Sequence, residues 1–268
     1  IVAMVGGRGQ KTASRTLNRA TDSYRQPGST FKVLSTYAPG IDSAGLTLAT
    51  VFNDAPFAYD DGTLVKNWWG SEYRGLNTVR TAIRDSMNVI AVEAFTLITP
   101  QLGYDYLKNF GFTTITDGVT INGKVYSDVQ QSTALGGLTY GVKNFELNAA
   151  YAAIANGGKI VTPHLNQRGY KTPEDAGINP AKLAIVQKGL DYVVSRGTGS
   201  RAGRFGVAVA GKTGTAQNSH GDDHALFAGY APADNPRYVA VAVVEAGKHG
   251  SSVAAPMVGE LLAHLLSH

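Results

Sequence analysis

Apolar side chains recur at steps of three and four residues in several segments of the chain, and this spacing places them on one face of an α-helix. The clearest example is residues 77–95, where Val79, Ile83, Met87 and Ile90 follow the pattern. Glycines just after two other segments favour helix termination there. The pattern predicts helices over residues 29–37, 77–95, 102–110, 145–156, 181–194 and 251–266.

Short runs of β-branched, aromatic and small apolar residues predict strands elsewhere. Residues 1–6 (IVAMVG) read as a buried strand, and three further runs follow one another at residues 207–215, 225–230 and 238–245. Consecutive strands with short connections pair antiparallel. The sequence therefore predicts an α+β fold rather than a parallel, doubly wound sheet.

Composition narrows the class of protein. The chain has 268 residues, of which 43% are hydrophobic and 16% charged, so it can bury a sizeable core. The net charge of +4 comes from scattered Lys and Arg residues, so a nucleic-acid partner is not expected. There are no cysteines, which excludes disulfides, Cys-based zinc sites and a thiol nucleophile. The six histidines show no metal-binding spacing such as HExxH, and we expect neither metal nor cofactor.

The ends of the chain bear on its organisation. It contains no apolar run of about 18 residues, so no membrane-spanning helix is expected. It opens directly on the strand-like residues 1–6, with neither an initiator Met nor a signal peptide. A chain that starts in the middle of a fold indicates a fragment of a longer protein.

Three short motifs carry candidate chemistry: STFK at residues 29–32 (SxxK), SMN at residues 86–88 (SxN) and KTGT at residues 212–215. A chain of this length contains roughly one SxxK by chance, so each motif alone is a weak signal. Their order and contexts are more specific. SxxK opens a predicted helix after Pro27-Gly28, SxN lies within or at the end of a helix, and KTGT ends a strand. This set occurs in class A β-lactamases and penicillin-binding proteins.

Ser29 and Lys32 are the candidate nucleophile and base. A serine hydroxyl needs a base to remove its proton, and a spacing of three residues puts Lys32 one helical turn from Ser29 on the same face. Lysine is normally protonated at neutral pH, but burial and a second cation, for which Lys212 is the candidate, favour its neutral form. Alone, Ser29 fits a helix N-cap and Lys32 a solvated charge. The other two motifs favour the catalytic interpretation.

The remaining motif residues have candidate roles around this pair. Ser86 would relay a proton toward the leaving group, and Asn88 would hydrogen-bond Lys32 and the substrate amide. The alternative is that both form a polar patch on an otherwise apolar helix.

The KTGT run has a binding role if it lies at the edge of a sheet, because an edge strand offers backbone pairing to an extended peptide. Its side chains Lys212, Thr213 and Thr215 would then bind a terminal carboxylate, and Gly214 would let the substrate backbone approach closely. The backbone N–H groups of Ser29 and Thr215 form the candidate oxyanion hole.

Two nucleotide-binding patterns also occur, and we reject both. Residues 206–213 match the Walker A pattern, but the variable positions alternate Val and Ala as in a strand, and no helix follows. Residues 197–202 mimic a dinucleotide fingerprint, but they follow a predicted helix rather than a strand. We predict a strand and a loop at these places.

Longer stretches around the motifs resemble the transpeptidase domain of high-molecular-mass penicillin-binding proteins over nearly the whole chain. They include NRATDSYRQPGSTFK, YRGLNTVRTAIRDSMNVIAVEAF, AAYAAIANGGKIVTPHL, GKTGTAQ and HALFAGYAP. Residues up to about 112 resemble the bifunctional class A proteins, and residues from about 150 onward the monofunctional class B proteins.

The resemblance implies a single domain over residues 1–268 with the β-lactamase/DD-transpeptidase type of fold. A five-stranded antiparallel sheet flanked by helices would come from residues 1–30 and 200–268, and an all-helical subdomain from roughly residues 40–190. The active site would lie between them. On this resemblance, the membrane anchor and N-terminal module of such proteins would be absent from this chain.

The resemblance also implies an activity. Ser29 would form an acyl-enzyme with the D-alanyl-D-alanine end of a peptidoglycan stem peptide, and an amine of a neighbouring stem would resolve it. β-Lactam antibiotics would acylate the same serine. The parent protein would act at the extracytoplasmic face of the bacterial membrane.

Other functions remain open on the sequence alone. They are a hydrolytic DD-carboxypeptidase or β-lactamase, and a β-lactam sensor or binding domain. A class A β-lactamase needs a glutamate after SxN with an asparagine four residues further on. Neither Glu72 nor Glu146 fits that pattern.

Overall fold

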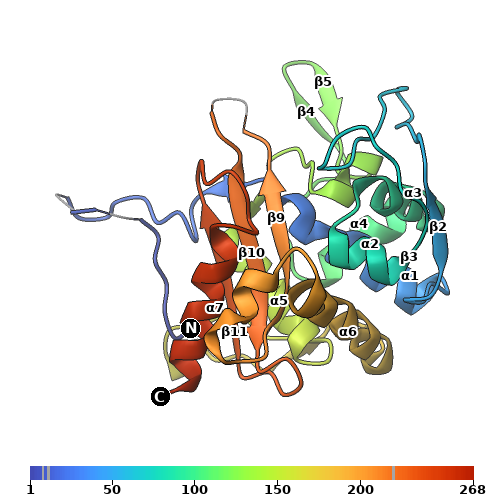
Figure 1. The fold of residues 1–268 in the computed structure, drawn as a ribbon. Coiled ribbons are helices and arrows are strands. Elements are labelled where there is room, and N and C mark those ends of the chain that lie inside the picture. Colours follow the sequence, from blue (N-terminus) through green and yellow to red (C-terminus); the bar gives the residue numbers. More distant parts are fainter. Residues whose placement is uncertain (8, 11–12, 219–220) are drawn as a thin grey trace.

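The computed structural model describes residues 1–7, 9–10, 13–218 and 221–268 as a mixture of helices and antiparallel strands (Figure 1). The predicted helices at residues 102–110, 145–156, 181–194 and 251–266 are confirmed, with ends shifted by at most three residues. The α-helices are α1 (Ala38–Ser43), α2 (Val79–Asp85), α3 (Asn88–Ile98), α4 (Pro100–Asn109), α5 (Asn144–Ala155), α6 (Pro180–Arg196) and α7 (Ala254–Leu266).

The main sheet consists of β9 (Ala210–Ala216), β10 (His224–Ala231) and β11 (Tyr238–Val244), in the order β11-β10-β9. Both pairings are antiparallel, as the short connections predict. Strand β9, which carries the KTGT motif, therefore lies at an edge of the sheet as the structure describes it.

The central strand β10 is covered on both faces, because its side chains alternate between two apolar clusters. Ala225, Phe227 and Ala231 pack with residues of α7, including Val258 and Leu262. Leu226, Ala228 and Tyr230 belong to the larger core, together with residues of α5 and with the buried segments that carry SxxK and SxN. The sheet thus lies between α7 and α5, and its α5 side is continuous with the core beneath the motifs.

Short two-stranded ladders complete the structure. They pair β1 (Tyr24–Arg25) with β6 (Val142–Lys143), β2 (Val51–Asp54) with β3 (Gly75–Thr78), β4 (Val119–Ile121) with β5 (Lys124–Tyr126), and β7 (Lys159–Ile160) with β8 (Glu174–Asp175). Among the described residues, no helix is long and apolar enough to span a membrane, and no cluster of His, Cys, Asp or Glu is arranged to hold a metal ion.

The prediction of a strand at residues 1–6 is wrong. The segment has no strand partner among the described residues, and Val2 and Val5 are 71% and 80% exposed. Two backbone hydrogen bonds are present: the Gly6 carbonyl accepts from the Arg19 N–H at 2.9 Å, and the Ile1 ammonium donates to the His164 carbonyl at 2.8 Å. The five-stranded sheet expected from the resemblance is correspondingly a three-stranded sheet in the part of the chain described. An apolar run shows that a segment suits a strand, but a strand forms only where a neighbour pairs with its backbone.

The predictions of single helices at residues 29–37 and 77–95 are also corrected. The first is a 3₁₀ turn (Gly28–Thr30) followed by a π-helical segment (Lys32–Tyr37) that runs into α1. The second is the end of β3, then α2, a break at Ser86, and α3. Both departures from regular helix fall at a motif, which is common where backbone geometry serves a site.

Candidate active site

The turn that carries Ser29 is held against the end of strand β9. Gly28, just before Ser29, has φ of +55°, and a Cβ there would lie 2.4 Å from the carbonyl oxygen of Thr215. Only glycine permits both this backbone conformation and this approach. From beneath, the buried Tyr151 hydroxyl donates to the Thr30 carbonyl at 2.7 Å. The turn is therefore fixed from two sides, and Ser29 itself stays partly exposed.

Ser86 occupies the break between α2 and α3 in a left-handed conformation, with φ of 55° and ψ of 43°. A non-glycine residue in this region costs about 1–2 kcal/mol, so surrounding contacts must hold it. The backbone supplies the first of them, because the Met87 N–H donates to the Ala82 carbonyl at 3.0 Å and closes the end of α2. Two lysines add side-chain contacts: the Ser86 hydroxyl oxygen accepts from Lys32 Nζ at 3.3 Å and from Lys212 Nζ at 2.7 Å. The break places Ser86 between the SxxK and KTGT motifs.

Lys32 is completely buried, and its amine faces the start of α3. Besides the Ser86 hydroxyl, Nζ donates to the Ser86 carbonyl at 2.7 Å, the Met87 carbonyl at 3.2 Å and Asn88 Oδ1 at 2.6 Å. The predicted hydrogen bond between Lys32 and Asn88 is thus present in the structure, and Ser86 also contacts the Lys32 amine.

Lys212 is also completely buried, with Nζ donating to Ser86 Oγ and, at 3.0 Å, to the Thr213 carbonyl. Its charge faces Ser86 rather than open solvent. Among the KTGT side chains, that of Thr215 is the exposed one. Lys212 is consequently better placed to set the electrostatics of the site than to contact a ligand directly.

Burial and mutual repulsion shift both lysines toward their neutral forms. Burial lowers the pKa of Lys32 well below its ordinary value, and the nearby positive charge of Lys212 lowers it further. Burial lowers the pKa of Lys212 to about 7. Both effects act on Lys32 and favour its neutral amine, which is the form a base requires.

The structure brings Lys32, Ser86, Asn88 and Lys212 into one hydrogen-bonded cluster and places Ser29 one turn before Lys32 in the chain. The Ser29 hydroxyl has no hydrogen-bond partner among the described residues. Hydrogen bonds to a nucleophile often tighten only when substrate binds. The connection from Ser29 to the base stays a prediction.

Gly214 has a packing reason to be glycine that the sequence did not show. A Cβ at this position would lie 2.8 Å from Thr30 Cγ2 and 3.0 Å from Leu226 Cβ. The middle of KTGT thus fits directly against the turn that carries Ser29. That Gly214 also lets a substrate backbone approach closely stays a prediction.

Residues outside the motifs also shape the cluster. The Thr198 hydroxyl lies 2.8 Å from the Thr213 hydroxyl, and the Thr198 N–H donates to the Arg84 carbonyl at 3.2 Å. A Cβ on Gly197 would lie 2.4 Å from that carbonyl, so the glycine-rich loop fits tightly between α2 and β9. The rejected dinucleotide pattern therefore forms a packing loop at residues 197–199 and the start of a 3₁₀ helix (Ser200–Phe205). The rejected Walker A pattern enters β9, where Lys212 is part of the strand.

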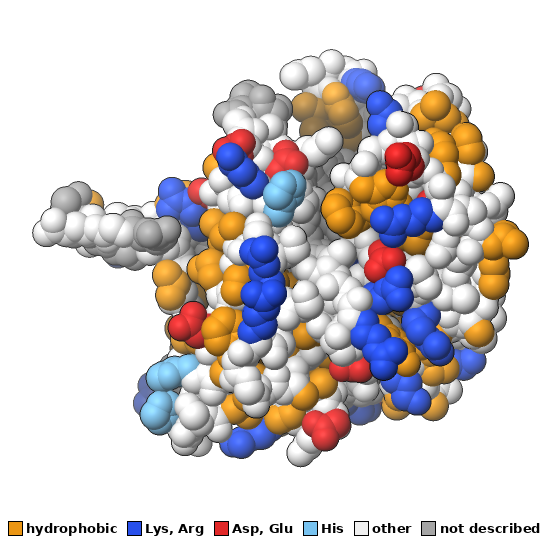
Figure 2. Space-filling view, in the orientation of Figure 1, with side chains coloured by type: hydrophobic (Ala, Val, Ile, Leu, Met, Phe, Trp, Pro, Cys, Tyr) orange, Lys and Arg blue, Asp and Glu red, His pale blue; other side chains and the backbone are white. Residues whose placement is uncertain are grey.

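The surface beside the cluster is basic and largely solvated. Lys and Arg side chains gather over α2 and α6 (Figure 2). Two of them, Arg80 and Arg196, lie over the Tyr192 ring, with centroid distances of 5.1 and 6.0 Å. Closer to Ser86, Asp85 pairs with Arg84 and Arg74.

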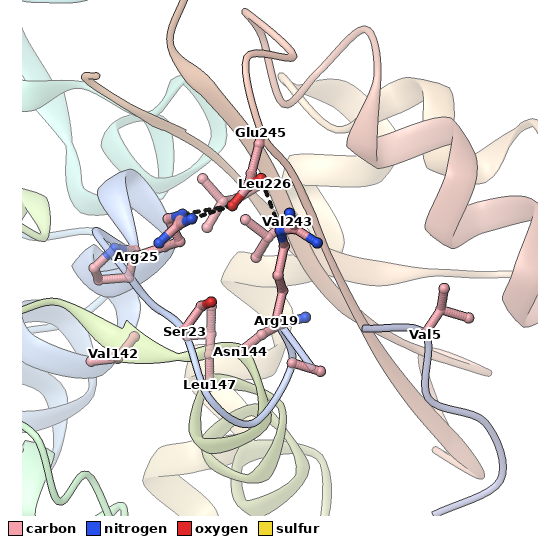
Figure 3. A pocket seen from close by; sticks show the side chains of 12 residues that line it. Val5, Arg19, Ser23, Arg25, Val142, Asn144, Leu147, Leu226, Val243 and Glu245 are labelled. Atoms are coloured by element: carbon pink, nitrogen blue, oxygen red, sulfur yellow. Dashed lines mark hydrogen bonds and ion pairs between the residues drawn. The ribbon is translucent and has the colours of Figure 1, made fainter. Parts of the chain in front are cut away.

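A separate small cavity of about 50 Å³ lies between the start of α5, strands β10 and β11, and the segment before Ser29 (Figure 3). Arg19 and Arg25 pair with Glu245 at its edge. Pro27 lines it, but none of the motif residues does. It is large enough for one or two water molecules and stands apart from the lysine cluster.

Comparison with known proteins agrees with this geometry. Residues 1–263 match the family model "Penicillin binding protein transpeptidase domain", so the chain belongs to that family. It is 32% identical over 251 residues to penicillin-binding protein 1A of Clostridium tetani, covering 87% of this chain and 31% of the relative. It is 30% identical over 269 residues to stage V sporulation protein D of Bacillus subtilis, covering 88% and 41% respectively.

Solved structures give the same fold class. The D,D-transpeptidase domain of a peptidoglycan glycosyltransferase from Eggerthella lenta superposes with a TM-score of 0.77 at 26% identity, covering 96% of this chain and 69% of that one. The α+β prediction and the β-lactamase/DD-transpeptidase type of fold are confirmed. The chain spans about a third to two fifths of the length of the two curated relatives.

Proposed function

We propose that this domain is a peptidoglycan D,D-transpeptidase that forms its acyl-enzyme on Ser29. The observation that carries the proposal is the buried cluster in which Lys32 and Lys212 meet at the Ser86 hydroxyl, next to the turn that holds Ser29. The family match supports it.

The chemistry follows from the protonation states. As Ser29 Oγ attacks the carbonyl carbon of the penultimate D-alanine, its proton passes to the neutral Lys32 amine. The backbone N–H groups of Ser29 and Thr215 would stabilise the oxyanion. When the C–N bond breaks, the leaving nitrogen of D-alanine takes a proton from the Ser86 hydroxyl, and Lys32 returns its proton to Ser86.

Ser86 suits this relay because of its two lysine partners. A hydroxyl oxygen has two lone pairs and one proton. Both lysine amines donate to that oxygen, so the proton of Ser86 is left for the substrate side of the cleft. In the second half-reaction an acceptor amine replaces D-alanine and the same transfers run in reverse.

Substrate binding would use the free edge of β9. An extended stem peptide can pair its backbone with this edge, with Thr213 and Thr215 supplying hydroxyl groups to the terminal carboxylate. Lys212 favours the anion by its charge from beneath the strand. β-Lactams, which carry a carboxylate beside a strained amide, would occupy the same place. We propose that the parent protein acts on peptidoglycan outside the cytoplasmic membrane, with its class A-like and class B-like halves as described above.

The test of this function is D-alanine exchange. A peptide ending in D-alanyl-D-alanine is incubated with the protein and a labelled D-amino acid, and released D-alanine and labelled peptide are measured separately. We expect both products, and neither with Ser29→Ala. Release of D-alanine without label incorporation indicates a carboxypeptidase. Acylation by β-lactams without any peptide turnover indicates a sensor.

The pKa of Lys212 leads to a prediction on pH dependence. The second-order rate constant for acylation should rise as Lys32 loses its proton, and fall above about pH 7 as Lys212 loses the charge that attracts the substrate carboxylate. In Lys212→Arg the guanidinium stays charged, so the fall at alkaline pH should disappear. Stopped-flow acylation with a chromogenic β-lactam from pH 5 to 10 checks this. An unchanged alkaline limb in the variant shows that another group causes it.

A further inference from the structure

The first turn of α3 begins at Asn88 and lacks a cap of its own. The first N–H groups of a helix have no partner within the helix, and a side chain at the N-cap position usually accepts from them. The N-cap residue here is Met87, which provides no such bond. Instead Asn67, 21 residues earlier, accepts through Oδ1 from the N–H of Asn88 at 2.8 Å and from that of Val89 at 3.3 Å.

A buried carboxylate fixes the orientation of this capping amide. Asn67 Nδ2 donates to Asp54 Oδ1 at 2.7 Å, and both residues are almost completely buried. An ionised carboxylate only accepts hydrogen bonds, so it holds the nitrogen of Asn67 and turns the oxygen toward α3. The other oxygen of Asp54 accepts from the backbone N–H of Arg74 at 2.8 Å, which ties the carboxylate to the loop leading into β3.

The neighbouring residue holds the side chain of Asn88. The Lys66 carbonyl accepts from Asn88 Nδ2 at 2.8 Å, and this leaves Asn88 Oδ1 facing Lys32 Nζ at 2.6 Å. Residues 66 and 67 together therefore set both the backbone position and the amide orientation of Asn88. The carbonyls of Ser86 and Met87, which also accept from Lys32, lie in the same short connection.

We propose that Asn67, oriented by Asp54, is a positioning residue for acyl transfer, which holds the start of α3 so that Asn88 keeps the Lys32 amine in place for Ser29. The inference rests on the proposed function of Lys32 and adds two residues outside all three motifs. Neither touches the substrate. A misplacement of about 1 Å at a reacting group costs about 100-fold in rate.

The test uses acylation by a chromogenic β-lactam, with the rate constant at saturation separated from the apparent binding constant. Asn67→Ala should lower the saturating rate about 10- to 100-fold and leave the binding constant within about threefold, because positioning acts on the chemical step. Asn179→Ala is the matched control. Asn179 caps α6 by accepting from the Ala181 N–H, so its loss should lower thermal stability, though less than loss of the buried Asn67, without slowing acylation.

An exchange of partners separates the hydrogen bond from mere packing. Asn67→Asp alone places two carboxylates face to face and should also be slow. The double variant Asp54→Asn, Asn67→Asp restores one donor between the two residues and keeps an oxygen on the helix N–H groups. It should recover the saturating rate to within about fivefold of wild type. If Asn67→Ala does not fold, the comparison of this double variant with Asn67→Asp still tests the positioning role.

A readout without turnover distinguishes this proposal from the proposed function. Titration of carbon-13-labelled lysine by NMR should show the Lys32 pKa lower in Asn67→Ala than in wild type, because a protonated amine loses a fixed acceptor, and unchanged in Asn179→Ala. Two results would overturn the positioning role and leave the proposed function standing. The first is an acylated wild-type protein with an Asn67→Ala saturating rate within twofold of the wild-type rate. The second is equal slowing in Asn179→Ala. A wild-type protein that is not acylated overturns the proposed function. The Lys32 titration in Asn67→Ala then still tests whether Asn67 holds the contact between Asn88 and the Lys32 amine.

Discussion

Lys32→Ala should abolish measurable acylation of Ser29 on the time scale on which the wild-type protein is fully acylated. Removing a general base typically costs about 10²–10⁴-fold in rate. We expect at least the upper part of this range, because the Lys32 amine also holds Ser86, which carries the leaving-group proton, and Asn88. Lys32→Met, which refills most of the buried volume, should behave in the same way and remain folded.

The measurement is the rate of acylation by a chromogenic β-lactam, with thermal unfolding as the check on folding. Lys188→Met serves as the matched control, because it removes an exposed lysine of α6 outside the cluster. Met offers no donor to the buried carbonyls of Ser86 and Met87, so Lys32→Met should lose some thermal stability but remain folded near neutral pH. A folded Lys32 variant that acylates within tenfold of wild type would show that another group takes the proton of Ser29.

The second large effect concerns the lifetime of the acyl-enzyme. Acylated Ser29 should persist for hours in water and be consumed faster by an acceptor amine, because no carboxylate among the described residues is hydrogen-bonded to the lysine cluster to activate water. Glu146 lies in the first turn of α5, with one oxygen accepting from the Thr113 hydroxyl and the other buried without a partner. Glu72 lies in the loop before β3 and is exposed. Neither contacts the lysine cluster.

Labelled penicillin bound to the protein is followed over time, with and without a D-amino acid. A half-life of hours, shortened by the amine, is the expected result. An amine is the stronger nucleophile once neutral, and Lys32 and Ser86 can take its proton as they took that of Ser29. Release within seconds in water would instead show an efficient hydrolytic base and move the assignment to a β-lactamase.

The sequence predicted the chemistry of the site better than its backbone. The residue types and order of SxxK, SxN and KTGT determined the cluster members, because the reaction needs a serine, a buried amine and a second cation near one another. The break at Ser86 was not visible, since the apolar spacing continues from Val79 to Ala94 across it. Ser86 caps α2 in its left-handed conformation through local backbone hydrogen bonds, and two lysines from distant segments hold its side chain.

The same limit applies to the residues that sequence reasoning missed. Asn67 and Asp54 lie in unremarkable polar positions of the chain, and only the fold brings the first to the helix start and the second behind it. Periodicity identifies which side chains are buried, but not which buried polar groups meet. Because the sequence did not show that a helix begins at Asn88, it gave no sign that Met87 leaves the first N–H groups of α3 without a cap.

The strand predictions succeeded where the pairing partner is close in the sequence and failed where it is not. Strands β9 to β11 follow one another closely in sequence, so each finds its partner through a short connection. Residues 1–6 have an equally strand-like composition, but the described structure offers them no paired neighbour. Local pattern is sufficient where pairing is local and insufficient where a partner must come from far along the chain.

The central claim, that Ser29 is the acylated nucleophile, is tested most directly by mass spectrometry of the intact protein after incubation with benzylpenicillin, followed by peptide mapping. The account predicts one added penicilloyl group on the peptide that contains Ser29, and none on Ser29→Ala. Folded protein that gains no mass, or that carries the group on any other residue, would contradict it.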